Sequence, residues 1–153
     1  MLSQFYLGKI FYEGIFCRVN YEKAKYYYLC AARNNHIESS FIVGFLYQEG
    51  KILKRDINRA IEFYKNASSF DNQYAKNNLG IIYLKGYDDK IKSNIGLSIE
   101  YFKEAIYQKQ DPVSMFNLSS IYIFNEFHDN HDNESIQLLI QSITKIEQIL
   151  PFI

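Results

Sequence analysis

The sequence has no tryptophan, only two prolines and two cysteines in 153 residues, and no net charge. Two cysteines, Cys17 and Cys30, are too few for a disulfide framework, and neither stands in the C-x-x-C spacing of a thiol metal site. The 17 basic residues are balanced by 17 acidic ones, so the attraction that drives non-specific binding to nucleic acids or anionic membranes is missing. We therefore expect neither partner.

Long apolar runs are missing too. The longest, residues 41–47, is far shorter than the roughly 20 residues that a membrane-spanning helix needs. The first residues show no basic segment followed by an apolar one, so no signal peptide is readable. We expect a soluble protein without membrane insertion and favour the cytoplasm, a reducing compartment that the scarcity of cysteine also fits.

Apolar and aromatic side chains are abundant, at 48% and 17% of the residues. A chain of this length and composition can bury a core, either as one domain or as a short array of small units. Intrinsic disorder is therefore not expected.

One motif occurs three times at a spacing of 36 residues. It consists of a small residue, an apolar residue followed by glycine, an aromatic residue and a second glycine. The three copies are Ser3, Leu7-Gly8, Phe11 and Gly14; Ser39, Val43-Gly44, Tyr47 and Gly50; and Ala75, Leu79-Gly80, Tyr83 and Gly86.

A second motif follows each copy of the first and has the pattern small-x-x-aromatic-aromatic-x-x-Ala. Its positions i, i+3, i+4 and i+7 lie on one face of an α-helix, whereas a strand would put the two rings on opposite faces. The copies begin at Ala24, Ala60 and Ser98, and their aromatic pairs are Tyr27-Tyr28, Phe63-Tyr64 and Tyr101-Phe102.

A fourth, degenerate unit is also present. Its first helix has Ser114, Leu118-Ser119 and Tyr122, and its second helix replaces the ring pair by Leu138-Leu139 between Ser135 and Ser142. That helix continues through Ile143 and Ile146, and we interpret the unit as the cap that closes an array.

Residues at the expected helix boundaries agree with helix-turn-helix units. Gly14, Gly50 and Gly86 can end helices with a positive φ, and Gly8, Gly44 and Gly80 indicate close backbone approach between paired helices. We expect N-caps at Asn20, Asp56, Asn94 and Asp111, the last followed by Pro112 at the first helical position. The sequence thus predicts an all-α fold, an α/α solenoid of four helix-turn-helix repeats forming a tetratricopeptide-like superhelix. We expect a single array of units at approximately 3–36, 37–70, 72–109 and 111–150.

The two motifs and their spacing resemble the Sel-one-like repeat family, a relative of the tetratricopeptide repeats. The resemblance implies an adaptor that binds a protein or peptide and has no chemistry of its own. The family usually has a second glycine where this chain has Phe16, Ile52 and Asp88, and Asn35 replaces another family glycine, at a place where asparagine adopts the left-handed region readily.

Catalytic motifs are absent: the sequence has no phosphate-binding glycine loop, no G-x-S-x-G elbow and no H-E-x-x-H helix. We expect no enzyme, no catalytic residue and no cofactor. One segment could bind a divalent metal, because residues 128–134 combine His128 and His131 with three carboxylates. The alternative, which we prefer, is a polar loop in which Asn133 caps the next helix.

The related repeats line their concave side with the first helix of each hairpin, and this predicts the binding surface. Positions beside the buried stripe of that helix should face the groove. They are Tyr6, Lys9, Tyr12, Ile42, Phe45, Gln48, Asn78, Ile81 and Leu84. For Phe45 and Ile81, packing between neighbouring hairpins remains the alternative.

The main hypothesis is therefore a non-catalytic scaffold or adaptor that binds a peptide or partner domain in a concave groove. Two alternatives remain open: a metal-binding or hydrolytic module centred on His128 and His131, and a piece of a longer array that acts in self-association.

Overall fold

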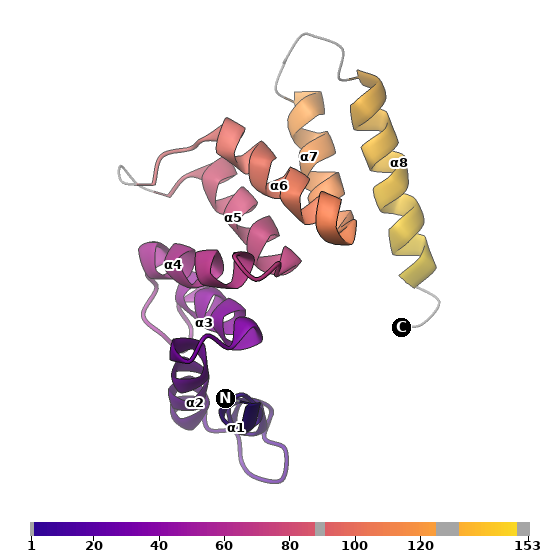
Figure 1. The fold of residues 1–153 in the computed structure, drawn as a ribbon. Coiled ribbons are helices and arrows are strands. Elements are labelled where there is room, and N and C mark those ends of the chain that lie inside the picture. The colour runs from indigo at the N-terminus through magenta and orange to yellow at the C-terminus, as the bar shows by residue number, and fades with distance from the viewer. Residues whose placement is uncertain (1, 88–90, 125–131, 150–153) are drawn as a thin grey trace. The chain divides into compact units, whose positions relative to one another are not determined.

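The computed structural model describes residues 2–87, 91–124 and 132–149, and these residues form eight α-helices and no strand (Figure 1). The all-α prediction is confirmed. In chain order the helices are α1 (Leu2–Glu13), α2 (Tyr21–Arg33), α3 (Ile37–Glu49), α4 (Ile57–Ser68), α5 (Gln73–Lys85), α6 (Ile95–Lys109), α7 (Pro112–Phe124) and α8 (Asp132–Ile149).

The chain divides into two compact units, residues 1–75 and 76–153. In the first unit α1 packs on α2, α2 on α3, and α3 on α4. In the second unit α6 packs on α7, and α7 on α8. Consecutive helices therefore pair as hairpins, and within each unit one hairpin packs on the next.

Side-chain caps start the second helices of the first three hairpins, as the sequence predicts. The Oδ1 atoms of Asn20, Asp56 and Asn94 each accept a hydrogen bond of 3.0 Å from the backbone N–H three residues later. Asp111 caps α7 in the same way, at 2.8 Å from the nitrogen of Ser114. One expected cap is wrong: α8 begins at Asp132, so Asn133 lies inside the helix.

Left-handed residues end the first helices of these hairpins. Gly14, Gly50 and Gly86 have φ values of 73°, 75° and 63°, which confirms the prediction. Asn35 also enters this region, at 60°. Phe16, which stands where the family has glycine, keeps a glycine-like φ of 63° with its ring 98% exposed.

The mid-helix glycines lie under aromatic rings. A β-carbon on any of them would come within 2.6 to 2.7 Å of a ring atom from the second helix of the same hairpin. The sequence predicted contact between the two backbones, but the space that a side chain would need is filled by the ring. The pairs are Gly8 with Tyr28, Gly44 with Tyr64, and Gly80 with Phe102.

The other ring of each aromatic pair stacks on the aromatic residue of the first helix. The ring centroids are 5.7 to 5.8 Å apart and the planes are within 17° of parallel. The three stacked pairs are Phe11 with Tyr27, Tyr47 with Phe63, and Tyr83 with Tyr101. In each of these hairpins, one ring of the second helix therefore packs on the glycine of the first helix, and the other ring stacks on the aromatic residue of the first helix.

Candidate partner-binding groove

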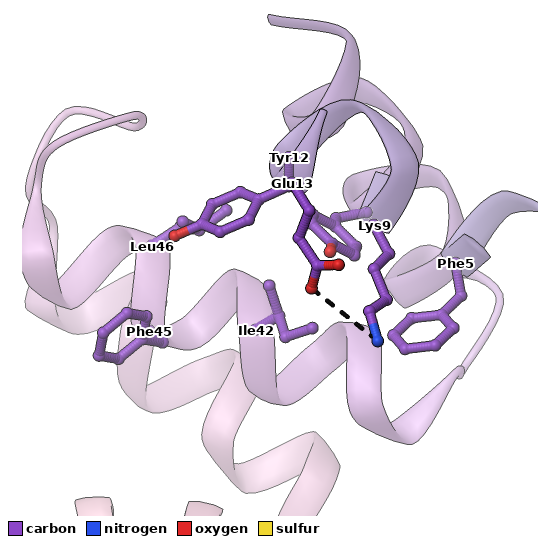
Figure 2. A pocket seen from close by; sticks show the side chains of 8 residues that line it. Phe5, Lys9, Tyr12, Glu13, Ile42, Phe45 and Leu46 are labelled. Carbon is purple, nitrogen blue, oxygen red and sulfur yellow. Dashed lines mark ion pairs between the residues drawn. The ribbon is translucent and has the colours of Figure 1, made fainter. Parts of the chain in front are cut away.

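A pocket of about 280 Å³ lies between α1 and α3 in the first unit (Figure 2). Helical spacing brings its lining residues to facing sides of the two helices, because positions three and four apart share a face. The lining consists of Phe5, Lys9, Tyr12 and Glu13 from α1, Tyr28 from α2, and Ile42, Phe45 and Leu46 from α3.

The charged groups of this pocket come from α1. Lys9 Nζ lies 3.9 Å from Glu13 Oε1, one helical turn away, and both side chains are nearly half exposed. Figure 2 shows this ion pair beside Phe5, with Ile42 on the neighbouring helix. An exposed pair of this kind contributes little to stability, so both groups are available to a ligand at low cost.

Tyr28 is the buried aromatic residue of the pocket. Its ring covers Gly8 and is centred 6.1 Å from the ring of Phe5 and 6.4 Å from that of Tyr12. Burial raises the pKa of Tyr28 to about 12, and the nearby Glu13 contributes to that rise. The phenol therefore stays neutral at physiological pH and keeps its proton as a hydrogen-bond donor.

A second pocket, of about 360 Å³, adjoins the first. The two have Tyr12, Phe45 and Leu46 in common. The second adds Tyr21, Glu49, Lys51 and Ile52, and in it Lys51 Nζ lies 3.2 Å from Glu49 Oε2. We call the two pockets together the α1–α3 groove.

Four of the residues predicted to face a groove line these pockets: Lys9, Tyr12, Ile42 and Phe45. Tyr6 is 53% exposed and lines neither pocket; its ring contacts Phe5 edge-on at 5.3 Å.

The other four predicted groove residues are all half-buried. Gln48 accepts a hydrogen bond of 2.8 Å from the hydroxyl of Tyr64, which ties it into its own hairpin. Asn78, Ile81 and Leu84 belong to the second unit. There, Ile81 and Leu84 pack against the core cluster of Phe102, Leu118, Ile121 and Tyr122. Ile81 thus packs against the next hairpin, which is the alternative given above for this residue.

Four residues that line the first pocket are not among those predicted from the sequence: Phe5, Glu13, Tyr28 and Leu46. Two had a readable signal, because Glu13 follows Lys9 by one turn and Leu46 follows Ile42 by one turn. Tyr28 belongs to the aromatic pair of the second motif; it is buried and also lines the pocket.

The proposed metal segment cannot be placed, because His128 and His131 lie outside the described residues. Within the described residues no group of three or more His, Cys, Asp or Glu side chains could hold a metal ion. Cys17 is exposed and Cys30 is half-buried, and both are free thiols. No helix in the described part of the chain is long and apolar enough to cross a membrane.

The fold resembles solved structures of repeat proteins. A Sel1 repeat protein from Oxalobacter formigenes superposes with a TM-score of 0.84 at 19% identity, covering 94% of this chain and 56% of that one. A protective antigen of uropathogenic Escherichia coli strains, which displays an SLR fold, gives 0.82 at 19% identity, covering 94% and 30%. These likenesses support the helical-repeat solenoid class.

Sequence comparison gives a curated relative, chitin synthase regulatory factor 3 of Schizosaccharomyces pombe. It is 29% identical over 121 residues, which is 77% of this chain and 13% of the regulatory factor. The chain thus spans a small part of that relative's length.

The family model for the Sel1 repeat matches three segments, residues 2–36, 37–69 and 73–109. The proteins of this family are typically non-catalytic and generally act as protein-interaction scaffolds. Since the matches cover well over half of the sequence, this chain belongs to the Sel1 repeat family.

Proposed function

We propose that this protein is a non-catalytic scaffold that binds an apolar segment of a partner protein in the α1–α3 groove. The observation that carries the proposal is the position of Phe45. Its side chain borders both pockets of the groove and is 40% exposed, so a partner can reach it. Aromatic side chains at the centre of a concave surface dominate the energetics of protein interfaces.

The chemistry of the groove favours a particular kind of segment. Its lining is mainly aromatic and aliphatic, and each pocket has one acidic and one basic group already paired with each other. An apolar segment would cover the aromatic and aliphatic lining and leave those exposed ion pairs in place. Two pockets with a common wall fit two apolar side chains of one segment.

The role of the wider protein is also part of the proposal. A scaffold acts by binding another protein, and the name of the curated relative, a regulatory factor, is consistent with such a role. We propose that this chain likewise acts through a bound partner.

The test compares three baits in affinity purification from the native cells: wild type, Phe45→Lys and Phe70→Lys. Phe70 is 53% exposed in the same unit but lines neither pocket, so it is a matched control for adding a lysine at an exposed phenylalanine. We expect a partner captured by wild type and Phe70→Lys and lost with Phe45→Lys. Equal capture by all three folded baits would contradict the proposal.

A further inference from the structure

The exposed side of α8 has a stripe of isoleucines. Ile136, Ile140, Ile143 and Ile146 are each between 42% and 58% exposed. The first three are spaced by four and three residues, so they lie on one side of the helix. We call these four isoleucines the α8 stripe.

The α8 stripe departs from what a terminal helix needs. A capping unit protects an array by presenting a polar outer face. An exposed apolar patch instead marks an interaction site. The helix that the sequence analysis interpreted as a cap therefore has the surface of an internal helix.

The repeat register indicates what covers such a surface. Ser135 corresponds to Ser98, so Ile136 and Ile143 correspond to Ile99 and Ile106 of α6. Both α6 isoleucines pack against a cluster to which α7, the first helix of the next hairpin, contributes buried residues. Lys103, at the position of Ile140, also reaches α7, with Nζ 5.8 Å from the ring centroid of Tyr122. The α8 stripe thus matches a surface built for the first helix of a Sel1 hairpin.

The first helix of this chain has the complementary property. Leu7 and Ile10 of α1 are only half-buried, and so is Gln4. The corresponding residues of α3, α5 and α7 are all buried. They are Val43, Leu46 and Ser40; Leu79, Ile82 and Lys76; and Leu118, Ile121 and Met115. Among the described first helices, α1 is therefore the one whose outer side is least covered.

We propose that the α8 stripe of one molecule binds the outer side of α1 of a second copy, repeating between molecules the contact that α6 makes with α7. The residues proposed to meet carry no charge that would have to be buried: the stripe consists of isoleucines, and the outer side of α1 has Gln4, Leu7 and Ile10. A contact between two different surfaces is heterologous, so each molecule can bind one neighbour through α8 and another through α1, and repetition of the contact builds a ring or an open chain. Its residues differ from those of the α1–α3 groove, and the two proposals can fail separately.

Sedimentation velocity over a wide concentration range tests the association. Wild type should sediment above its monomer mass of 18.1 kDa as concentration rises. Ile143→Glu should raise the dissociation constant about tenfold or more, because the contact would bury a charge. Gln137→Glu is the control on the same helix; Gln137 corresponds to Glu100 of α6, which is exposed, and the variant should associate like wild type. A wild type that is monomeric throughout, or an Ile143→Glu that associates normally, would overturn the proposal.

A mixing experiment identifies the partner surface. Gln4→Glu and Leu7→Glu both alter the outer side of α1. Gln4→Glu is used for mixing because Gln4 is polar and half-buried, so its change leaves the core intact. Ile143→Glu mixed with Gln4→Glu should form dimers and nothing larger, since each molecule keeps one intact surface. An α8-to-α8 dimer would instead leave Gln4→Glu fully associated by itself, and that result refutes the head-to-tail contact.

Discussion

The ring of Tyr64 lies directly over Gly44, so close that a β-carbon on the glycine would stand 2.7 Å from ring atom Cδ1. The same contact joins Gly8 to Tyr28 and Gly80 to Phe102. Because Tyr28 also borders the α1–α3 groove, the contact that closes the first hairpin also sets the inner boundary of the binding surface.

Gly44→Val should destabilise the protein by several kcal/mol, roughly 3 or more. The branched side chain can avoid the clash only if Tyr64, which is fully buried, moves and the hairpin opens. Urea denaturation followed by circular dichroism measures the loss. A midpoint equal to that of wild type would show that the ring does not require a glycine here.

Gly96→Ala is the matched control. Gly96 lies in the exposed first turn of α6, and a β-carbon there would meet nothing closer than Asn94 Oδ1 at 3.6 Å. Alanine is the better helix former by up to about 1 kcal/mol, so this variant should be as stable as wild type or slightly more stable.

The raised pKa of Tyr28 predicts that the protein loses stability at alkaline pH. Its folded-state pKa of about 12 lies above the value of about 10 for an unfolded tyrosine. The stabilising effect of the neutral phenol is therefore complete below pH 10 and is lost as the pH rises toward 12. The loss is on the order of 2 kcal/mol. Tyr28→Phe keeps the ring but does not titrate, so its unfolding free energy should fall less steeply over this range. Equal slopes for the two proteins would contradict the assignment.

Glycines, ring pairs and caps could be predicted from the sequence because they recur at a fixed spacing. Gly50, for example, ends α3 with a positive φ where its repeat position requires it. The ring over Gly44 was missed because the pattern gives only which helix face carries Tyr64, and says nothing of the direction in which the ring turns.

The groove could be predicted only in part, for a related reason. Helix periodicity gives the side of α1 and α3 that faces outward, and Lys9 and Phe45 follow from it. The same periodicity holds for Ile81, yet that side chain is half-buried by packing in its own unit. Whether a neighbouring hairpin covers such a position depends on tertiary packing, which a single helix pattern does not contain.

Changing His128 and His131 together to Ala should leave the protein's stability and partner binding unchanged, because we interpret this segment as a polar loop. Inductively coupled plasma analysis of the purified wild type should find no stoichiometric metal. A double mutant that lost bound zinc or failed to fold would revive the metal-site hypothesis.

The central claim is that the α1–α3 groove binds the partner, and calorimetric titration of an identified partner tests it most directly. Phe45→Lys should weaken binding by about 2 kcal/mol or more, roughly 30-fold in Kd, with the melting temperature and circular dichroism near wild type. Phe70→Lys should bind like wild type. A Phe45→Lys protein that folds and binds with wild-type affinity would contradict the account.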